Sequence, residues 1–425
     1  MRVLIVGSGG REHALAWKLG QSPLVSEIHC APGNGGTAQI GRNAAIGDSD
    51  IPALMEYIRA HDIAFVVPGP EAPLVGGLVD ACRAAGVPCF GPSAYCARLE
   101  GSKSFAKELM REAGIPTANF AVFTDAARAR AHVESHGAPL VVKADGLAAG
   151  KGVVVARTTE EALEAVDAMM VRHIFGEAGD TVVIEDALAG EEVSFLCLCD
   201  GEDVLPLPSA QDHKAVFDGD KGPNTGGMGA YSPAPLLPAD RYGAMADLVI
   251  RPVLRALKKR GHPFSGILYA GLMMTDAGPM VLEYNTRFGD PECQPILLRL
   301  ESDLMELMLA AFRGELAGKG ISLSEKPALC VVVAAKGYPG EYPTGMEIGG
   351  LTEAEAVKPG AVKVFQAGTR LAGGKVVSSG GRILGVTAAA DTLGETRALA
   401  YRALEAIRME NMYFRRDIGA KALRP

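Results

Sequence analysis

The stretch Val141-Val-Lys-Ala-Asp-Gly-Leu-Ala-Ala-Gly-Lys-Gly-Val-Val-Val-Ala156 places a glycine-rich turn with two lysines between two apolar runs. A nucleotide-hydrolysing P-loop has Gly, four further residues, Gly-Lys and then Ser or Thr, and a helix follows it. Here Asp145 stands at the position of the first glycine, and Gly152 replaces the hydroxyl residue. The β-branched run that follows favours a strand. The loop is therefore predicted to join two strands and to lie over a nucleotide as a flap.

Composition and charge limit the classes of protein that fit this chain. Its 425 residues, 48% of them hydrophobic, can bury a large core and predict two to four domains. A formal net charge of -8 without a Lys/Arg-rich run argues against a general nucleic-acid or membrane-surface binder. No apolar run approaches the ~18 residues of a membrane span, and the first run is too short for a signal peptide. We therefore expect a cytoplasmic protein with no nucleic-acid or membrane partner, whose eight cysteines are reduced core thiols.

The alternation of apolar and amphipathic stretches predicts an α/β protein with three domains. Residues 1–100 alternate strands with helices, which predicts a doubly wound parallel sheet with a last strand at 87–90. Residues 101–325 hold the flap within a mobile subdomain at about 118–190, followed by longer strands. Residues 326–425, rich in Gly and Val, predict a small α+β domain.

Helices and one long loop complete the predicted organisation. Continuous helices are predicted over 96–114, 159–171 and 295–313. The stretch Asp212–Pro235 is crowded with Gly and Pro and is predicted to be a loop. A loop of that length inside a compact domain is usually functional or disordered.

A glycine cluster, Gly7-Ser-Gly-Gly-Arg-Glu12, follows the first strand and opens a helix, which is the setting of a dinucleotide fingerprint. However, Glu12 occupies the third glycine position, and the second strand ends in His29-Cys-Ala31 without an acidic residue. The cluster therefore argues against NAD and leaves a structural turn or another phosphorylated or sugar ligand. Glu71 follows the third strand at the same edge of the sheet, where it suits a ligand hydroxyl or amine, or caps the next helix.

Polar side chains alternate along the apolar strand that begins at Val281. Because side chains two apart in a strand share a face, Glu283, Asn285 and Arg287 should point the same way. Hard oxygen donors hold Mg²⁺, and the fork of an arginine matches a phosphoryl group in transfer. A solvated strand face, the other interpretation, fits poorly with so apolar a strand. The sequence therefore predicts a site for metal-assisted phosphoryl transfer.

Longer motifs point to one family. The flap, the pair Glu185-x6-Glu192 and the strand Glu283-x-Asn285-x-Arg287 look like an ATP-grasp ligase. The further motifs are Gly7-Ser-Gly-Gly-Arg-Glu-His-Ala14, Pro68-Gly-Pro-Glu71, Leu99-Glu-Gly-Ser-Lys103, Gln211-Asp-His-Lys214, Gly222–Pro233 and Arg287-Phe-Gly-Asp-Pro-Glu292. Together they closely resemble the phosphoribosylamine–glycine ligase family over almost the whole chain, with Cys293 in place of an expected Thr.

This resemblance implies a central ATP-grasp fold between the N-terminal and C-terminal domains. It implies ATP-dependent ligation of glycine to 5-phosphoribosylamine through glycyl phosphate, giving glycinamide ribonucleotide, ADP and phosphate in de novo purine biosynthesis. The implied cofactors are ATP and Mg²⁺ or Mn²⁺, the partners are small-molecule substrates, and the resemblance admits a monomer. The loop Gly222–Pro233 is expected to cover the intermediate and to exclude water.

The resemblance also implies a role for particular residues. It places ATP on Lys103, Lys143, Gly146, Gly150, Lys151, Gly152, Glu185, Asp186, Leu188 and Glu192. It places the metal ion on Glu283 and Asn285. The implied catalytic residues are Lys143, Asp212 and Arg287. The implied contacts of glycine and the phosphoribosylamine are Gly9, Gly10, Arg11, Glu71, Asp212, Arg287, Asp290, Arg370 and Arg382.

Other interpretations stay open at this point. Lys103 by itself would be taken for an exposed helix lysine, and Arg370 or Arg382 by itself for a surface charge. The same fold admits a different carboxylate–amine ligase or a carboxylase. A nucleotide- or NAD-binding dehydrogenase or regulator is a different class, against which the missing acid after the second strand argues.

Overall fold

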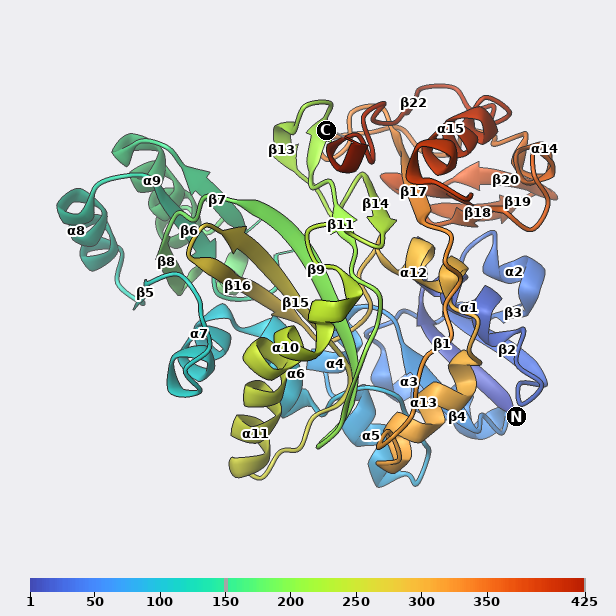
Figure 1. Cartoon of the computed structure of the whole chain (residues 1–425), viewed down its shortest axis with the longest axis horizontal. Helices are drawn as coiled ribbons and strands as arrows, with labels where there is room; N and C mark the ends of the chain where they lie inside the picture. The colour runs from blue at the N-terminus through green and yellow to red at the C-terminus, as the bar shows by residue number, and fades with distance from the viewer. Residues whose placement is uncertain (149–151, 424–425) are drawn as a thin grey trace.

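The computed structural model describes residues 1–148 and 152–423 of the chain, which Figure 1 follows from blue to red. The N-terminal region is a parallel sheet in the order β3-β2-β1-β4. Its strands are β1 (Arg2–Gly7), β2 (Glu27–Pro32), β3 (Arg42–Asn43) and β4 (Phe65–Pro68). Its helices are α1 (Gly10–Leu19), α2 (Thr37–Ile40), α3 (Ile51–Ala60), α4 (Glu71–Val75) and α5 (Leu78–Ala84).

Helices cover both faces of this sheet, because alternate residues of β1 point to opposite sides. Ile5 packs in one core with Leu15 of α1, and Val6 packs in another with Leu54 of α3. The predicted doubly wound sheet is confirmed. The strand predicted at 87–90 is wrong in length: it is reduced to a single bridge at Cys89, and the chain turns away at Gly91, whose φ is 151°.

The prediction of one continuous helix over 96–114 is wrong, because the helix is interrupted at Ser102. The break separates α6 (Ala94–Gly101) from α7 (Lys103–Glu112). Ser102 has an extended backbone, and its Oγ accepts the N–H of Phe105 at 3.2 Å, which caps α7. Asp145 reinforces the break by accepting the backbone N–H of Ser104 at 2.6 Å. As a result, Lys103 begins a helix beside the strand that carries the flap.

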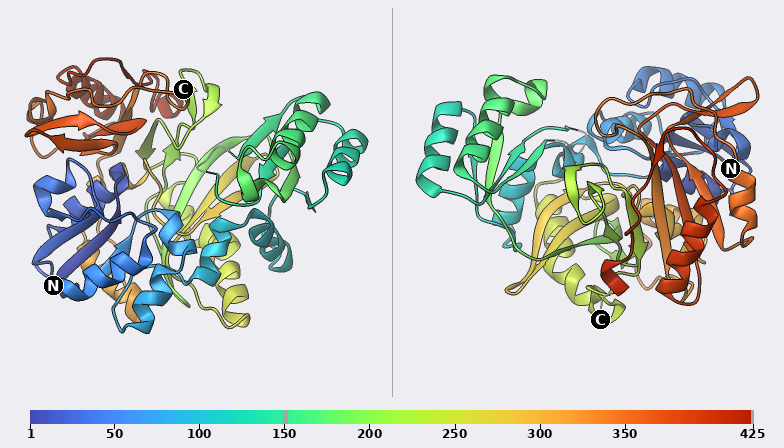
Figure 2. Two further views of the ribbon diagram at one scale, coloured as in Figure 1. Left: turned by 180° about the vertical axis from the view of Figure 1, so that it is seen from behind. Right: turned by 90° about the horizontal axis from the view of Figure 1, so that it is seen from above.

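The flap belongs to a separate sheet of antiparallel neighbours in the order β5-β8-β6-β7. The strands β6 and β7 flank the flap as adjacent antiparallel partners, so the predicted strand-to-strand loop is confirmed. This subdomain stands across the central sheet from the terminal regions (Figures 1 and 2). Its elements are β5 (Phe120–Phe123), α8 (Ala126–His136), β6 (Leu140–Ala144), β7 (Val153–Ala156), α9 (Thr159–Val166), the π-helical turn η1 (Asp167–Val171), the 3₁₀ turn η2 (Gly176–Gly179) and β8 (Val182–Asp186).

The central sheet is antiparallel, in the order β10-β9-β15-β16. Its strands are β9 (Glu191–Asp200), β10 (Val204–Pro206), β15 (Ser265–Thr275) and β16 (Gly278–Asn285). The prediction of one continuous helix over 295–313 is wrong, because this stretch forms two helices. Asp303 caps the second one by accepting the N–H groups of Met305 and Glu306. The helical elements are η3 (Ala239–Arg241), α10 (Tyr242–Met245), η4 (Ala246–Ile250), α11 (Arg251–Lys259), α12 (Cys293–Arg299) and α13 (Leu304–Arg313).

The C-terminal sheet runs in the order β11-β14-β17-β21-β18, with β22 also paired to β17. Its strands are β11 (Gln211–Asp212), β14 (Gly229–Ser232), β17 (Ala328–Ala335), β18 (Val362–Gln366), β21 (Arg382–Ala389) and β22 (Met412–Tyr413). The helical elements are α14 (Leu351–Ala356), α15 (Leu393–Leu404) and η5 (Lys421–Leu423), and β19 (Thr369–Ala372) pairs with β20 (Lys375–Ser378). Both views of Figure 2 show this region beside the N-terminal one, where the backbone N–H of Gln366 donates to His13 at 2.8 Å.

The stretch predicted as a loop over Asp212–Pro235 contains β14 and a hairpin of β12 (Ala215–Phe217) and β13 (Lys221–Asn224). That prediction is wrong because these strands are only three or four residues long within a Gly-rich stretch, and β14 gains its partner, β17, from the distant C-terminal region. All eight cysteines are buried and free, as predicted. No helix of the described chain is both long and apolar enough to cross a membrane.

Candidate functional site

One cleft collects side chains from all the regions described above. The predicted site residues that line it are Gly9, Arg11, Glu71, Lys103, Lys143, Gly152, Glu185, Asp186, Leu188, Glu192, Asp212, Glu283, Asn285, Arg287, Asp290 and Arg382. Gly10 is buried instead, and a Cβ there would lie 2.7 Å from Nε2 of Gln294. Gly146 contributes its carbonyl oxygen, 3.2 Å from Nζ of Lys103. Arg370 is exposed on β19 outside the cleft, whereas Gly150 and Lys151 lie outside the described residues.

The alternation along β16 delivers Glu283 and Asn285 to the cleft, with Arg287 just beyond the strand. Burial alone would raise the pKa of Glu283, but the neighbouring cations lower it below its ordinary value. The cations that do so are Lys214, Lys143, Lys103 and Arg287. The glutamate is therefore ionised and available as a hard anionic donor.

Arg287 is held between two carboxylates. Its Nη2 lies 2.7 Å from Glu100, its Nε lies 3.4 Å from Glu71, and Nη2 also donates to Oδ1 of Asn285 at 3.2 Å. Burial acts to lower the pKa of Arg287, but Glu100 and Glu71 outweigh it and raise that pKa. Within the described part of the chain, Nε makes no closer polar contact than its 3.4 Å ion pair with Glu71, so this buried donor is only weakly engaged.

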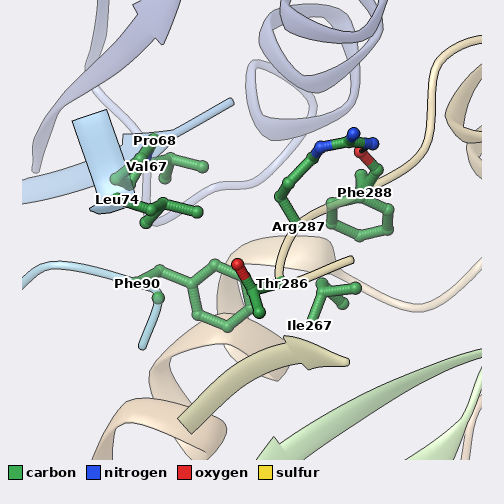
Figure 3. Close-up of a pocket in the computed structure, with 9 residues that line it drawn as sticks. Val67, Pro68, Leu74, Phe90, Ile267, Thr286, Arg287 and Phe288 are labelled. Atoms are coloured by element: carbon green, nitrogen blue, oxygen red, sulfur yellow. Dashed lines mark hydrogen bonds between the residues drawn. The ribbon is translucent and has the colours of Figure 1, made fainter. Parts of the chain in front are cut away.

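A small apolar pocket lies beside this arginine, between the N-terminal region and the central sheet (Figure 3). Phe90 and Ile267 approach Thr286 there, and Val67 and Leu74 close the opposite side. The pocket offers few polar partners. The apolar side chains that line it lie against the segment after β16, which carries Thr286 and Arg287.

A buried charge cluster centres on Glu185 of β8. Nζ of Lys143 on β6 and Nζ of Lys107 on α7 lie 3.0 and 2.9 Å from its carboxylate. Burial lowers the pKa of Lys107 to about 8, against the opposing effect of Glu185. The sequence analysis missed Lys107, although it stands four residues after Lys103 and so lies on the same side of a helix.

Lys214 was also missed as an individual residue, although it ends a recognised motif. Its Nζ lies 2.7 Å from Glu192 and 3.8 Å from Glu283, so it bridges two predicted ligand-binding carboxylates. Burial would lower the pKa of Lys214, but these glutamates raise it well above its ordinary value. Lys214 and Glu283 are about seventy residues apart in the sequence (positions 214 and 283), and the fold brings them together.

An acidic part of the cleft lies around Asp212. Burial and the nearby Glu292 raise the pKa of Asp212. Glu292 accepts hydrogen bonds from the hydroxyl of Tyr269 at 2.6 Å and from that of Ser194 at 3.1 Å. Two carboxyl groups near each other in a buried site favour a cationic ligand, such as an ammonium group.

The side chain of Glu12 fills the N-terminal glycine turn. Oε2 of Glu12 accepts the N–H of Gly9 at 2.5 Å, and a Cβ on Gly69 would lie 1.9 Å from Oε1. Arg11 pairs with Glu12 at 2.5 Å and donates to the carbonyl of Phe288 at 3.0 Å. A carboxylate in the turn repels a pyrophosphate, so the geometry argues against dinucleotide binding.

Arg382 reaches the cleft from the start of β21. Its Nη1 donates to the carbonyl oxygens of Gly226 at 2.6 Å and Asp290 at 2.6 Å, and Nη2 lies 3.4 Å from Oδ2 of Asp290. It thereby ties the loop after β13 to the segment after β16. Gln294 donates to Oδ1 of Asp290 at 2.7 Å and completes this corner.

The fold and the cleft together define an ATP-grasp enzyme. Three family descriptions match consecutive parts of the chain: "Phosphoribosylglycinamide synthetase, N domain" over 1–100, "ATP-grasp (A) domain" over 101–293 and "C domain" over 328–421. The chain belongs to the phosphoribosylglycinamide synthetase family. Its α/β architecture, with an N-terminal doubly wound domain, a central ATP-grasp fold and a small C-terminal α+β domain, is that of the family.

Individual relatives agree with this assignment. The chain is 52% identical over 423 residues to the phosphoribosylamine–glycine ligase of Rhizobium meliloti, covering 100% of this chain and 99% of that one. It is 51% identical to the trifunctional purine biosynthetic protein adenosine-3 of Gallus gallus, covering 99% of this chain and 42% of that protein.

Two solved structures are similar in fold. A phosphoribosylamine–glycine ligase from Thermotoga maritima has a TM-score of 0.85 at 35% identity, covering 99% of this chain and 100% of that one. The biotin carboxylase domain of the Hydrogenobacter thermophilus 2-oxoglutarate carboxylase, in complex with MgADP, has a TM-score of 0.74 at 16% identity, covering 97% and 91%. The second likeness concerns the fold alone.

The charge on Glu283 yields a first prediction. Glu283→Gln keeps the shape but leaves the surrounding lysines without this counter-charge, so metal affinity and turnover should both fall. Turnover is expected to drop by about 10²-fold or more, and a magnesium titration of the rate should show only partial recovery. Glu347→Gln, which removes an exposed partner of Lys375, is the matched control. Near-normal turnover of Glu283→Gln at limiting Mg²⁺ would contradict a metal role.

Proposed function

We propose that this chain catalyses the ATP-dependent ligation of glycine to 5-phosphoribosylamine in de novo purine biosynthesis. The products are glycinamide ribonucleotide, ADP and phosphate. The observation that carries this proposal is that Glu283, Asn285 and Arg287 share one cleft with Lys103 and Lys143. Relatives that are 52% and 35% identical over nearly the full chain bear the name of this activity, which supports the choice of substrates.

The chemistry requires activation of a carboxylate, which is a poor electrophile because it repels nucleophiles and oxide is a poor leaving group. A carboxylate oxygen of glycine attacks the terminal phosphorus of ATP, giving glycyl phosphate and ADP. The amine of phosphoribosylamine then attacks the carbonyl carbon, the C–O bond breaks, phosphate leaves and the amine loses a proton. Both steps depend on positioning and on charge neutralisation, so no Ser or Cys nucleophile is needed.

The residues present fit magnesium-bound ATP. Glu283 and Asn285 offer two oxygen donors, and Mg²⁺ usually takes one or two protein ligands together with phosphate oxygens and water. The described residues contain no group of three or more His, Cys, Asp or Glu that could hold a metal by itself. Bound Mg²⁺ would neutralise phosphate charge. The Nε donor of Arg287, which has only a 3.4 Å ion pair with Glu71, suits an oxygen of the acyl phosphate.

The remaining ATP contacts are proposed from the family resemblance, and the position of most of these residues in the cleft supports them. Lys103 and Lys143 are proposed to hold the phosphates, with flap amides between Gly146 and Gly152 above them. The proposed adenine and ribose contacts are Glu185, Asp186, Leu188 and Glu192. Lys151 and Gly150 keep their predicted phosphate role as part of the flap.

The acceptor and glycine contacts are proposals of the same kind. Asp212 and Asp290 are assigned to the ammonium group of glycine, which the acidic part of the cleft supports. Gly9, Arg11 and Glu71, which line the cleft, are assigned to the ribose of phosphoribosylamine, whereas Gly10 is buried and keeps only its sequence-based prediction. Arg382 and Arg370 are assigned to its 5′-phosphate. Gly222–Pro233 is assigned as the cover over the intermediate.

Several expectations from the sequence stay predictions. They are the domain limits 1–100, 101–325 and 326–425, the mobility of about 118–190, use of Mn²⁺ in place of Mg²⁺, a monomeric state, a cytoplasmic location and the lack of nucleic-acid or membrane partners. Since β11 and β14 pair within the C-terminal sheet, residues 211–232 should move with that domain.

The requirement for glycine tests the proposal directly. ADP release should be stimulated by glycine when phosphoribosylamine is generated in the same reaction, and other amino acids in a panel should stimulate it far less. A different ATP-grasp ligase or a carboxylase would respond to another substrate, and a dehydrogenase would release no ADP. Absence of stimulation by glycine would overturn the proposed activity.

The two arginines assigned to the acceptor phosphate yield a further prediction. Charge-assisted hydrogen bonds contribute about 1.5 to 3 kcal/mol, so Arg382→Ala should raise the KM for phosphoribosylamine by roughly one to two orders of magnitude. Arg370→Ala should have a smaller effect, because its side chain is exposed and does not line the cleft. The KM values for glycine and ATP should change little. If Arg382→Ala leaves all three KM values unchanged, the assignment is wrong.

A further inference from the structure

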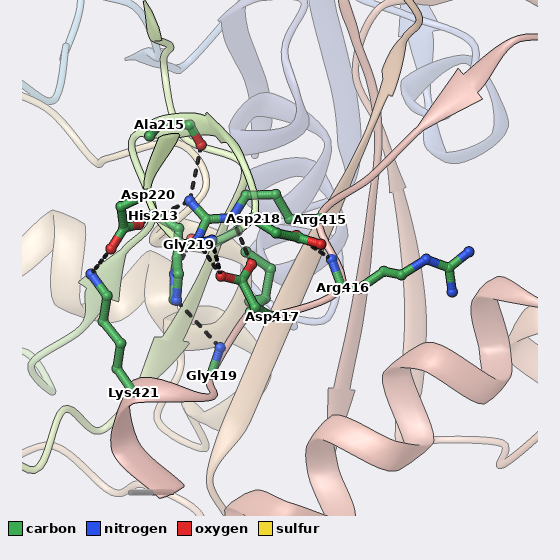
Figure 4. Close-up of polar contacts among 12 residues, drawn as sticks. His213, Ala215, Asp218, Gly219, Asp220, Arg415, Arg416, Asp417, Gly419 and Lys421 are labelled. Carbon is green, nitrogen blue, oxygen red and sulfur yellow. Dashed lines mark hydrogen bonds and ion pairs between the residues drawn. The ribbon is translucent and has the colours of Figure 1, made fainter. Parts of the chain in front are cut away.

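The C-terminal segment 412–421 lies against the β12–β13 hairpin, far from it in sequence (Figure 4). The hydroxyl of Tyr413 donates to the carbonyl oxygen of Val216 at 3.1 Å, and the N–H of Arg416 donates to Oδ1 of Asp218 at 2.8 Å. Lys421 Nζ lies 2.6 Å from Oδ2 of Asp220. These contacts run along β12 and around the turn that follows it.

Arg415 is the centre of this network, and its side chain is 0% exposed. Its Nη1 donates to the carbonyl oxygen of Ala215 and to Oδ1 of Asp220, both at 3.0 Å. Its Nε and Nη2 donate to the two carboxylate oxygens of Asp417 at 2.8 and 2.7 Å. Asp417 in turn accepts the N–H of Gly219 at 2.8 Å. The guanidinium therefore joins the C-terminal segment to the start of the hairpin and to its turn.

His213 adds a second connection at the base of the hairpin. Burial, followed by the charges of Arg415 and Lys421, lowers its pKa to about 4, so the ring is neutral near pH 7. Its Nδ1 lies 3.1 Å from the carbonyl oxygen of Gly229, which can only accept, so this nitrogen carries the proton. The bare Nε2 accepts the N–H of Gly419 at 3.4 Å.

The hairpin so held begins and ends at the cleft. Asp212 and Lys214 flank His213, and both line the cleft. At the other end, Asn224 and Thr225 line it as well. Among the described residues that line the cleft, none belongs to segment 412–421. The segment therefore touches no bound substrate itself, and the hairpin is its direct connection to Asp212 and Lys214, while its β22 part pairs with β17.

We infer that Arg415 is a positioning residue for the ligation step. With His213 and Asp417, it fixes the hairpin so that Asp212 and Lys214 keep their places and the following loop shields glycyl phosphate from water. This inference rests on the function proposed above. It assigns to the C-terminal segment a part in coupling phosphoryl transfer to amide formation.

The coupling between the two steps provides the test. Arg415→Met in the full-length protein should lower formation of glycinamide ribonucleotide by about tenfold or more. Glycine-dependent ADP release should fall less, because the loosened loop lets water consume the intermediate. The ADP formed per ribonucleotide should therefore rise above the wild-type ratio. A role in stability alone would reduce the active fraction and lower both rates together, with no change in the ratio.

Matched variants separate these outcomes. Arg416→Met removes an exposed arginine of the same segment, whose side chain lies over Phe414 and points away from the network (Figure 4), so its ratio should stay at the wild-type value. Arg415→Lys keeps the charge and should restore part of the coupling. If Arg415→Met does not fold, Asp220→Asn and Lys421→Met remove less buried contacts of the same network. Their ratios of ADP to glycinamide ribonucleotide then provide the test.

An unchanged ratio in the folded variants overturns the inference about Arg415. A wild-type protein that shows no glycine-dependent ADP release overturns the proposed ligation instead, so the two failures are distinguishable.

Discussion

Charge balance within the cleft is the constraint on which the other features of this molecule depend. Lysines and glutamates line it in pairs: Lys107 and Lys143 with Glu185, and Lys214 with Glu192 and Glu283. Cations so close together would repel one another in surroundings of low dielectric if no carboxylate lay between them. The glutamates therefore allow the lysines to lie close together. A bound polyanion could then replace some of these glutamate–lysine ion pairs. Loss of Glu185 would leave Lys107 and Lys143 buried and unpaired, whereas Lys214, Glu192 and Glu283 are partly exposed and depend less on one another.

The fold meets this constraint by bringing short polar segments to one place from separate elements. Two adjacent strands of the flap subdomain carry Lys143 and Glu185, and the break before α7 aims Lys103 at the flap. The central sheet supplies Glu283 and Asn285, and the β12–β13 hairpin supplies Lys214 at its base. Each of these elements has its own hydrophobic core or partner strand, so polar groups can project from rigid supports.

The local sequence pattern is enough to predict features that depend on a single helix or strand. Alternation along β16 predicts the shared face of Glu283 and Asn285, because the pleat of a strand fixes side-chain direction whatever the surroundings. The strand on either side of the flap follows from β-branched residues for the same reason. By contrast, the helix break at Ser102 combines a local serine cap with hydrogen bonds to Asp145, and the sequence near 102 does not reveal the second part. The partners of Lys214 and Arg415 are set by tertiary contacts between distant segments, so no periodicity marks them.

The transfer of oxygen from glycine to phosphate tests the central claim most directly. Glycine labelled with ¹⁸O in its carboxylate is supplied with ATP, Mg²⁺ and phosphoribosylamine, and the phosphate released is analysed by mass. If a carboxylate oxygen attacks the terminal phosphorus and the C–O bond later breaks, each phosphate released carries one ¹⁸O atom from glycine. Unlabelled phosphate formed alongside glycinamide ribonucleotide would contradict activation through glycyl phosphate, and with it the role assigned to this cleft.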